Sequence, residues 1–549
     1  MLKRILVVIP ARGGSKGIPK KNIRLMAGMP LIAYSILTAK KSRYSVDIVV
    51  STDDDEIGRV SSRYGAEVMS RPAHLAADEV TLDPVVYHVV LEKEKMSGEK
   101  YDVVITMQPT SPLLSVTTFD SALDFFFSND FDSVLSGVND PHLAWGKKNS
   151  MIVPLYEKRL NRQYLPVHLR ETGAFFISRR DCVKEDSRFG TRVSVYPIPE
   201  NESVDIDTPH DWWIAEKELL KKNIIIRVEG YKEIGTGHIQ RGLLLGYNLI
   251  DHNVHYVLSR KSDIGIAKIK ESHFPYSVIE DDQELYSLLE DLECDILIND
   301  MLNTTEEYIK QCKKRNIRVI NFEDLGEGGQ YADAVINDLY EKQNSYKNYF
   351  WGSEYYCIKD EFLLSEPSEF RDEVEEILVS FGGTDPSNLT SKVLECVPQI
   401  SSRVHFTFIL GMGYSENDHL NLKGNYIPSN VDIVSNVSYM TDYMKKADIA
   451  VCSQGRTMLE LASMAVPTVL LAQNEREQNH EFGYLKNGFL NLGLGEEVEK
   501  ETIVETLKWL INSKQIRAQI RNQMLKLDLK KGLKRTLRII FEGGRDNEQ

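Results

Sequence analysis

The stretch PARGGSKGIPKKN, residues 10–22, follows directly on the apolar run ILVVI that begins at Ile5. The apolar run predicts a buried strand, and the glycines after it predict a loop whose backbone amides can close around phosphate oxygens. Arg12 and the lysines of the stretch supply the positive charge that nucleotidyl transfer needs as pyrophosphate leaves. The lysine-bearing Walker pattern of P-loop kinases is absent from it. We therefore expect a triphosphate-binding loop here, in preference to a plain basic surface loop.

Strand-like apolar runs alternate with amphipathic, helix-like stretches along the chain. After ILVVI, the runs in the first 220 residues are DIVVST from Asp47, DVVITMQ from Asp102, DSVLSG from Asp132 and AFFISR from Ala174. This alternation is typical of an α/β unit with a mainly parallel sheet and helices on both faces. The order of strand, glycine turn and helix starts again at residues 223–238 and at residues 376–385. We expect three regions, residues 1–222, 223–370 and 371–549, of which the last two form doubly wound lobes facing one cleft.

Composition and charge exclude several classes of protein. A net charge of −15 argues against a nucleic-acid partner and against an anionic membrane surface. The six cysteines are scattered without a CxxC pair, which predicts neither a zinc site nor a disulfide framework and favours the cytoplasm. No apolar stretch reaches membrane-spanning length. Disorder is expected only for the tail GGRDNEQ, residues 543–549.

Six motifs of the first region resemble, in their order, those of the CMP-acylneuraminate cytidylyltransferases. They are PARGGSKGIPKKN, STDD, RPAHLAADE, QPTSPLL, RQYLPVHLRETGAFFI and SVDIDTPHDW. The resemblance covers about residues 1–222 and implies a Rossmann-like fold, a dimerisation arm and hence a homodimer, with magnesium as cofactor. It implies CTP and a nonulosonic acid as substrates. It also implies that Arg12, Ser15, Lys21, Asn22 and Arg71 contact the nucleotide, and that Lys21 stabilises the leaving pyrophosphate. The residues implied for the sugar acid are Gln108, Arg162, Arg170 and Phe176.

The SVDID segment carries the residues expected to hold magnesium. On a strand, the alternating Asp205 and Asp207 would project to one face and hold the ion against the triphosphate. Without the resemblance, a carboxylate before a Thr-Pro turn is more often a helix cap, and Asp207 could also serve there. The expected reaction is attack by the anomeric hydroxyl of the sugar acid on the α-phosphorus of CTP. Thr172 and Phe176 stand where relatives carry Asn and Tyr, which favours an acceptor of pseudaminic or legionaminic type.

A histidine after a glycine turn is the main candidate in the second region. In EIGTGHIQRG, Gly235 and Gly237 bracket a turn that places His238 at the start of a predicted helix. The positive end of a helix dipole disfavours imidazolium, so we expect a neutral ring that can accept a proton from water. An isolated histidine is more often structural, but its position between strand and helix favours catalysis.

IGTGHIQR, INFEDL, FGGTD and SQGRTMLE together resemble the UDP-sugar hydrolase of the pseudaminic acid pathway, within the GT-B glycosyltransferase superfamily. The resemblance spans about residues 224–490 and implies a two-lobed GT-B-like unit with no cofactor and His238 as the base. It places UDP or the sugar against Gly383, Thr457, Glu460 and Asn474. The sequence departs from it at Glu229, where the hydrolase usually carries Asp.

The chain is thus expected to be a bifunctional enzyme of nonulosonic acid biosynthesis. The first region would activate a pseudaminic- or legionaminic-type acid with CTP, and the rest would hydrolyse a UDP-2,4-diacetamido-trideoxyhexose. Two alternatives stay open for the second activity: a glycosyltransferase, or a non-catalytic module that binds nucleotide sugars. Hydrolase and transferase share the nucleotide cradle and differ in whether water or a sugar hydroxyl reaches the anomeric carbon.

Overall fold

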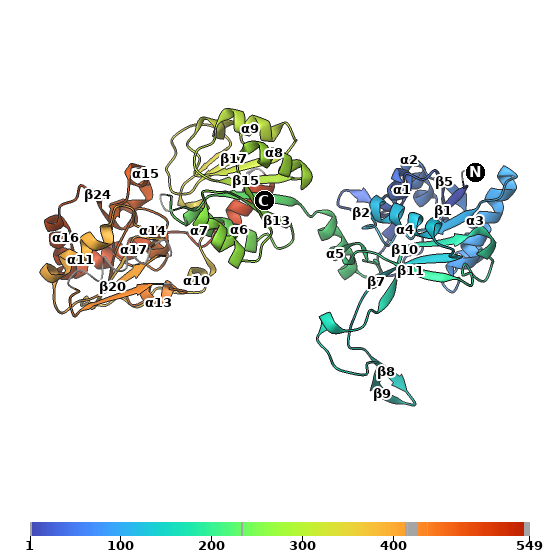
Figure 1. Cartoon of the computed structure of the whole chain (residues 1–549), viewed down its shortest axis with the longest axis horizontal. Helices are drawn as coiled ribbons and strands as arrows, with labels where there is room; N and C mark the ends of the chain where they lie inside the picture. Colours follow the sequence, from blue (N-terminus) through green and yellow to red (C-terminus); the bar gives the residue numbers. More distant parts are fainter. Residues whose placement is uncertain (1–2, 232–233, 412–413, 415–426, 436, 543–549) are drawn as a thin grey trace. The chain divides into compact units, whose positions relative to one another are not determined.

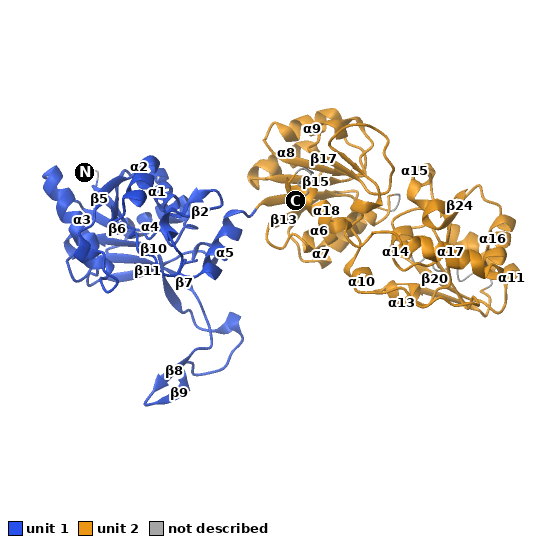
Figure 2. Ribbon diagram, turned by 180° about the vertical axis from the view of Figure 1, so that it is seen from behind, with its two compact units in different colours: residues 1–221 blue, residues 222–549 orange. Residues whose placement is uncertain are grey.

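The computed structural model describes residues 3–231, 234–411, 414, 427–435 and 437–542 of the 549-residue chain. The GGRDNEQ tail, for which the sequence predicts disorder, lies outside these residues. The chain divides into two compact units, residues 1–221 (unit 1) and 222–549 (unit 2), which Figure 2 shows in different colours. None of the helices in the described ranges is long and apolar enough to cross a membrane.

In the described part of unit 1, a seven-stranded sheet has the order β11-β7-β10-β6-β1-β4-β5 (Figure 1). Its neighbouring strands are parallel, except that β10 runs antiparallel to both β6 and β7. The strands are β1 (Ile5–Pro10), β4 (Val46–Thr52), β5 (Glu67–Ser70), β6 (Val103–Thr106), β7 (Ser133–Asn139), β10 (Leu169–Arg179) and β11 (Val193–Pro197). The expected α/β fold with a mainly parallel sheet is confirmed, and each apolar run found in the sequence contributes a strand.

Helices cover both faces of this sheet because successive residues of a strand point to opposite sides. Ile5, Val7 and Ile9 of β1 belong to an apolar cluster with α1 and α4, whereas Leu6 and Val8 pack with α3. The helices of unit 1 are α1 (Leu31–Lys41), α2 (Asp55–Tyr64), α3 (Leu82–Ser97), α4 (Val116–Ser128) and α5 (Pro209–Leu219). A short hairpin, β2 (Leu25–Met26) with β3 (Met29–Pro30), precedes α1.

The SVDID segment is not a strand, so the prediction that its aspartates alternate along one was wrong. It lies between the short 3-10 helix Glu200–Glu202 and α5. Thr208, rather than Asp207, caps α5, because its side chain accepts a hydrogen bond from the backbone N–H of Asp211 in a capping box. The segment joins the two helices without pairing to a strand of the described sheet.

A hairpin of β8 (Trp145–Lys148) and β9 (Met151–Pro154) leaves the sheet between β7 and β10 and extends away from it (Figure 1). Large apolar side chains on it are exposed: Trp145 by 56%, Met151 by 65% and Ile152 by 66%. A cluster of exposed apolar side chains on one element marks an interaction surface. We call residues 145–155 the arm.

Unit 2 contains two lobes, each built on a parallel sheet. In the described part of the first lobe the order is β14-β13-β12-β15-β16-β17-β18. Its strands are β12 (Asn223–Val228), β13 (Asn253–Ser259), β14 (Tyr276–Ile279), β15 (Ile296–Asp300), β16 (Arg318–Phe322), β17 (Ala334–Asn337) and β18 (Tyr349–Trp351). Its helices are α6 (Gly237–Tyr247), α7 (Asp263–Glu271), α8 (Asp282–Asp291) and α9 (Glu306–Lys313). α6 and α7 pack on one face of the sheet and α8 and α9 on the other.

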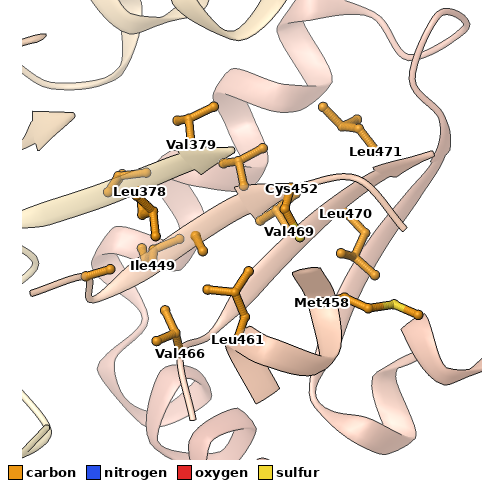
Figure 3. Packing of buried hydrophobic residues seen from close by; sticks show 14 of the residues in the cluster. Leu378, Val379, Ile449, Cys452, Met458, Leu461, Val466, Val469, Leu470 and Leu471 are labelled. Carbon is orange, nitrogen blue, oxygen red and sulfur yellow. The ribbon is translucent and has the colours of Figure 1, made fainter. Parts of the chain in front are cut away.

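The second lobe has the strand order β21-β20-β19-β22-β23-β24 among its described residues. Its strands are β19 (Glu376–Ser380), β20 (His405–Leu410), β21 (Val431–Ser435), β22 (Ile449–Cys452), β23 (Thr468–Ala472) and β24 (Phe489–Leu494). Its helices are α10 (Asp360–Leu363), α11 (Leu389–Ile400), α13 (Thr441–Met444), α14 (Thr457–Ser463), α15 (Glu475–Gln478), α16 (Lys500–Asn512) and α17 (Lys514–Met524). Figure 3 shows how aliphatic side chains of β19, β22, β23 and α14 interlock in its core.

The last helix, α18 (Gly532–Glu542), packs on the first lobe, whereas the sequence analysis placed the carboxy-terminal helices with residues 371–549 in the second. Ile539 and Ile540 join the apolar cluster of β12 and α6. Arg318 of β16 donates from Nε to the carbonyl oxygen of Ile540 at 2.8 Å. The apolar side of α18 is buried against this sheet and against Tyr355, whose carbonyl oxygen accepts a hydrogen bond from the Thr536 hydroxyl at 2.9 Å.

Candidate active sites

The loop after β1 is held against two other motif segments of unit 1. The backbone N–H of Gly13 donates to Asp53 Oδ1 at 3.0 Å, and a Cβ at Gly13 would lie 2.8 Å from Asp54 Oδ2. A Cβ at Gly17 would collide with the carbonyl oxygen of Asp207. The glycines therefore permit the close approach of the STDD and SVDID segments. Three motifs that are far apart in the sequence meet at the carboxyl end of β1.

Lys21 is fixed at this meeting point. Its Nζ donates to the carbonyl oxygen of Ile206 at 2.6 Å and lies 3.5 Å from Asp207 Oδ1, and its side chain is only 13% exposed. Asn22 donates from Nδ2 to the carbonyl oxygen of Arg12 at 3.0 Å, which closes the loop on itself. The structure thus brings Arg12, Lys21, Asn22 and Asp207 into one region.

Asp78 is a carboxylate of this region that the sequence analysis missed, although its RPAHLAADE motif was noted. It forms ion pairs with Arg12 at 2.6 Å and with Lys16 at 2.5 Å. Hydrogen bonds from Lys16 and Arg12 lower the pKa of Asp78, which keeps it ionised at neutral pH. Ser15 lies between Arg12 and Lys16 in the sequence, and its backbone N–H donates to the carbonyl oxygen of Gly13 at 3.1 Å. A triphosphate entering the loop would compete with Asp78 for both cations.

Arg71, expected near the nucleotide, is buried and engaged with the protein itself. Its Nη2 donates to the carbonyl oxygen of Ser51 at 2.7 Å and its Nε to the hydroxyl of Ser51 at 3.3 Å. Burial lowers the pKa of Arg71, and the nearby Asp53 only partly offsets this effect. Arg71 therefore anchors the end of β4, next to the STDD segment.

A polar cluster lies beside Gly173 of β10. A Cβ at Gly173 would lie 3.1 Å from the carboxamide of Gln108 and 3.3 Å from Ser111 Oγ. The hydroxyls of Thr110 and Ser111 are buried with no hydrogen-bond partner among the described residues. Buried hydroxyls are costly unless a ligand or water satisfies them, so Gln108, Thr110 and Ser111 suit the hydroxyls of a bound sugar. Of the three, the sequence analysis had named only Gln108.

The two arginines expected to bind the sugar carboxylate are paired with other carboxylates. Arg170 Nε lies 2.9 Å from Asp140 Oδ2, and Arg162 Nη2 lies 3.5 Å from Glu200 Oε1. Both guanidinium groups are partly exposed, so a ligand carboxylate can replace these partners.

Phe176 and Thr172 lie inside unit 1. The Phe176 ring packs edge-on against Phe189, and the Arg188 guanidinium lies over it at 4.9 Å. The buried Thr172 hydroxyl donates to Ser136 Oγ at 2.8 Å. The structure therefore gives no support to the interpretation of these residues as altered sugar contacts, because their side chains serve the packing of β10.

Asp205 and Asp207 remain the candidates for a metal site. Asp205 Oδ1 is buried and lacks a hydrogen-bond partner among the described residues, whereas the Asp207 side chain is largely exposed. The described residues contain no cluster of three or more His, Cys, Asp or Glu side chains that could hold a metal. Magnesium needs only one or two protein carboxylates when phosphates and waters complete its octahedron. The unpartnered oxygen of Asp205 fits that requirement.

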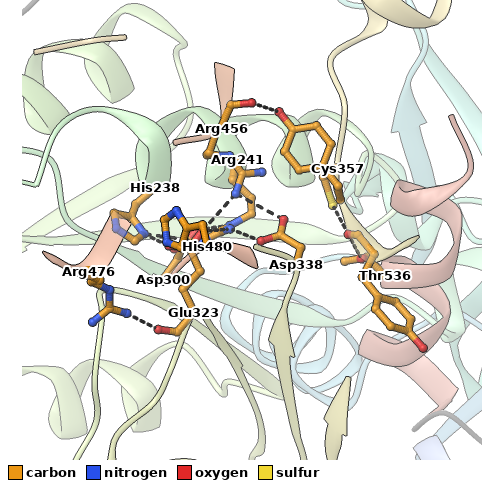
Figure 4. Close-up of polar contacts among 12 residues, drawn as sticks. His238, Arg241, Asp300, Glu323, Asp338, Cys357, Arg456, Arg476, His480 and Thr536 are labelled. Carbon is orange, nitrogen blue, oxygen red and sulfur yellow. Dashed lines mark hydrogen bonds and ion pairs between the residues drawn. The ribbon is translucent and has the colours of Figure 1, made fainter. Parts of the chain in front are cut away.

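In unit 2, His238 lies in the first turn of α6, after a turn in which Gly235 takes a φ of +75°. The ring is buried, and its Nδ1 is hydrogen-bonded to Asp300 Oδ1 at the end of β15 (Figure 4). An ionised carboxylate can only accept, so Nδ1 carries the proton and Nε2 is left to accept one. The sequence predicts a neutral ring from the helix dipole alone, and it is the structure that reveals Asp300 as the partner of Nδ1.

Arg241, one turn along α6, gathers three carboxylates (Figure 4). It binds Asp300 Oδ2 at 2.7 Å, Glu323 Oε1 at 2.7 Å and Asp338 Oδ1 at 3.3 Å, and its side chain is fully buried. Burial favours a raised pKa for Asp300, but Arg241 and His238 hold it below its usual range. For Asp338, burial prevails and raises the pKa.

The three carboxylates could have been found in the sequence. They end or directly follow three consecutive parallel strands, in the segments ILIND, VINFED and AVIND. Side chains at the carboxyl ends of neighbouring parallel strands meet at one edge of the sheet.

The glycine turns of the two lobes touch within unit 2. A Cβ at Gly383 would collide with Thr236 of the IGTG turn. Thr457 is the first residue of α14 and follows the SQG turn after β22 with one residue, Arg456, in between. Glu460, expected to bind ribose, is buried and lies 3.0 Å from Lys359 Nζ, so it is a paired carboxylate in this structure.

Asn474, expected near the sugar, caps α15 by accepting a hydrogen bond from the N–H of Glu477 at 3.0 Å. Its oxygen is therefore used in the fold, and its amide nitrogen is the group it can offer a ligand. Glu229, the departure from the hydrolase motif, is buried and accepts hydrogen bonds from Ser259 and Ser262. The longer side chain is thus accommodated within the first lobe.

Comparisons with known proteins agree with the division of the chain into units 1 and 2. Residues 6–221 match the family model for cytidylyltransferases, and residues 377–535 match that for the glycosyltransferase family 28 C-terminal domain. CMP-N,N'-diacetyllegionaminic acid synthase of Campylobacter jejuni serotype O:2 is 34% identical over 230 residues, 41% of this chain and 98% of the relative. Pseudaminic acid cytidylyltransferase of Campylobacter jejuni serotype O:23/36 is 33% identical over 226 residues, 40% of this chain and 97% of the relative.

Two further similar proteins differ in how much of their own length is matched. N-acylneuraminate cytidylyltransferase A of Danio rerio is 31% identical over 40% of this chain, which spans 51% of that relative's length. Among solved structures, MurG of Acinetobacter baumannii is similar over 58% of this chain and 99% of its own, with 13% identity and a TM-score of 0.45.

The first prediction concerns Glu477, whose Oε2 accepts a hydrogen bond from the N–H of Gln473 at 2.9 Å. Burial raises the pKa of Glu477 from 4.5 to about 7. A carboxyl whose pKa is raised by folding loses stability as pH rises from the unfolded to the folded value, here from about 4.5 to 7. We expect Glu477→Gln to be more stable than the wild type at pH 8, by up to roughly 3 kcal/mol, and equally stable at pH 4.

Denaturant unfolding of unit 2 across this pH range measures the effect. Glu475→Gln, an exposed neighbour on the same helix, is the matched control, and its stability should follow the wild-type curve at every pH because Glu477 is still present. Parallel pH curves for the wild type and Glu477→Gln would contradict the raised pKa.

Proposed function

Since residues 6–221 make this chain a member of the cytidylyltransferase family, we propose that unit 1 transfers CMP from CTP to a nonulosonic acid of legionaminic or pseudaminic type. The observation that carries the proposal is the convergence of the glycine loop, the STDD segment and the SVDID segment around Lys21. The names of two relatives that match over nearly their whole length support the class of sugar acid.

In this reaction the anomeric hydroxyl of the sugar acid attacks the α-phosphorus of CTP. A new oxygen–phosphorus bond forms, the bond from the α-phosphorus to the bridging oxygen breaks, pyrophosphate departs and the hydroxyl proton passes to solvent. Lys21, with Arg12 and Lys16 transferred from Asp78 to the phosphates, neutralises the charge that builds up on the leaving group. Gln108, Thr110 and Ser111 hold the hydroxyls of the sugar acid, which aligns the attacking oxygen.

We propose that Asp205 and Asp207 hold magnesium during this reaction. The buried, unpartnered oxygen of Asp205 and the proximity of Asp207 to Lys21 support the assignment. When bound, magnesium supplies positive charge to the triphosphate. Lys21 stays beside the SVDID segment through its hydrogen bond to the carbonyl oxygen of Ile206.

Lys21→Ala tests this site. We expect pyrophosphate release to require both magnesium and a nonulosonic acid. In Lys21→Ala the kcat of this release should fall about 100-fold, because one charged donor to the leaving group is lost. Lys20→Ala is the control: this neighbouring side chain is exposed and pairs with Glu56 at 2.7 Å. Equal loss in both variants, or full activity of Lys21→Ala, would remove Lys21 from the mechanism.

We also propose that unit 1 forms a homodimer through the arm. The exposed Trp145, Met151 and Ile152 support this, since a single chain leaves them in water. A second copy of the same surface would bury them in a two-fold interface.

The double substitution Met151→Glu and Ile152→Glu is expected to convert the dimer to a monomer, because it places four charges in the interface. Analytical ultracentrifugation measures the change. Met96→Glu, at an equally exposed methionine outside the arm, should leave the dimer intact. A wild-type chain that is already a monomer would contradict the proposal.

For unit 2 we propose hydrolysis of a UDP-2,4-diacetamido-trideoxyhexose. His238 Nε2 takes a proton from water, the water oxygen bonds to the anomeric carbon, and the bond from that carbon to the β-phosphate oxygen breaks to release UDP. The Asp300–His238 hydrogen bond supports this role because it orients the ring and stabilises its protonated form. A second candidate is glycosyl transfer, which the match of residues 377–535 to the glycosyltransferase family 28 C-terminal domain favours.

UDP release by the full chain, assayed without CTP, separates these candidates. Hydrolysis predicts UDP release with no acceptor sugar and a loss of about 10²- to 10⁴-fold in His238→Ala. The control is His255→Ala, a half-buried histidine of β13 that contacts Ser277. Release only with an acceptor would indicate a glycosyltransferase, and binding without release would indicate a non-catalytic module.

A further inference from the structure

Arg456 belongs to the second lobe of unit 2, and its side chain forms ion pairs with carboxylates of the first lobe. It stands between the SQG turn and α14, and its Nη1 lies 3.2 Å from Glu323 Oε1 and 3.3 Å from Asp338 Oδ2 (Figure 4). The guanidinium of Arg456 lies over the aromatic ring of Tyr356, 4.8 Å from its centre. The Tyr356 hydroxyl in turn donates to the carbonyl oxygen of Arg456 at 3.3 Å. The side chain is thus held in place before any ligand arrives.

The carboxylates that Arg456 contacts already have a partner in their own lobe. Arg241 binds Glu323 Oε1 at 2.7 Å, closer than Arg456 does, and also contacts Asp338. The Arg241 side chain is fully buried, whereas that of Arg456 is 16% exposed. If Arg456 moved away, Glu323 and Asp338 would still be paired, which avoids the large cost of a buried, unpaired charge. Arg456 is therefore the cation of this cluster that can change partners.

Arg456 also passes beside the turn that carries His238. A Cβ at Gly237, the residue before His238, would lie 3.1 Å from Arg456 Cδ. In a UDP-sugar, a single oxygen separates the anomeric carbon from the β-phosphorus. A substrate whose anomeric carbon faces His238 consequently has its β-phosphate within reach of this guanidinium.

We infer that Arg456 binds the diphosphate of the UDP-sugar, exchanging Glu323 and Asp338 of the first lobe for phosphate oxygens. The planar guanidinium offers two parallel N–H groups that match two oxygens of a phosphate. On bond cleavage, the same contact neutralises the charge left on UDP. The inference rests on the proposed function of unit 2, and it gives a role to a residue that the sequence analysis did not single out.

Calorimetric titration of the full chain with UDP and with uridine tests the inference, because only UDP carries the phosphates. We expect Arg456→Ala to weaken UDP binding about 10- to 100-fold, as for loss of a charged hydrogen bond, and to leave uridine binding unchanged. Arg456→Lys, which keeps the charge but not the fork, should be intermediate and serves if the alanine variant does not fold. Any UDP bound by unit 1 is the same in all variants.

Arg476→Ala is the matched control, since Arg476 also reaches from the second lobe to the first, donating to the carbonyl oxygen of Glu323 at 2.6 Å. If the substitution Arg476→Ala acts only by weakening the contact between the two lobes, it should change the binding of UDP and of uridine equally. The inference alone would be overturned if Arg456→Ala and Arg456→Lys left UDP binding unaffected. It would also be overturned if these variants lost affinity for UDP and for uridine equally. Absence of UDP binding by the wild type would overturn the proposed function of unit 2 and the inference with it.

Discussion

The buried guanidinium of Arg241 is the interaction on which the second half of this chain depends. Three carboxylates at the ends of neighbouring strands could not be buried together without a cation between them, because each would pay the cost of leaving water. Arg241 holds Asp300 ionised, and Asp300 orients His238. Because Arg241 also pairs with Glu323 and Asp338, Arg456 is able to leave these two carboxylates for another partner. One residue in the second turn of a helix thereby links the fold of the first lobe to the chemistry proposed for it.

Unit 1 follows the same physical rule with less burial. Arg12 and Lys16 are paired with Asp78, and Lys21 lies beside Asp207, so the cations needed for a triphosphate are held by protein carboxylates until it arrives. Such pairs keep the side chains in position, and exchange costs little because one ionic partner replaces another. In both units, the cations proposed to bind phosphate are thus paired with protein carboxylates.

The close approach of chain segments is the second constraint shared by the two units. Gly13 and Gly17 let two distant segments close on the β1 loop, and Gly383 lets the turns of two lobes touch at Thr236. A methyl group at these positions would separate segments that carry residues proposed to act on one ligand. The glycines thus serve the meeting of segments as much as the shape of each turn.

Local pattern was enough to predict the α/β fold, the restarts after residues 222 and 375, the placement of Lys21 in the loop after the first strand, and that of His238 at a strand-to-helix turn. These features depend on residues that are near one another in the chain, where periodicity and turn chemistry act. Only the tertiary structure decided that SVDID is not a strand, that α18 returns to the first lobe, and that Thr172 is packed inside. It also supplied the partners: Asp300 is 62 residues from His238, and Ile206 is 185 residues from Lys21. Spacing along the chain gives neither pair: Asp300 is indicated only when the ends of neighbouring strands are considered together, and Ile206 lies in a segment without strand or helix that approaches Lys21 through the fold.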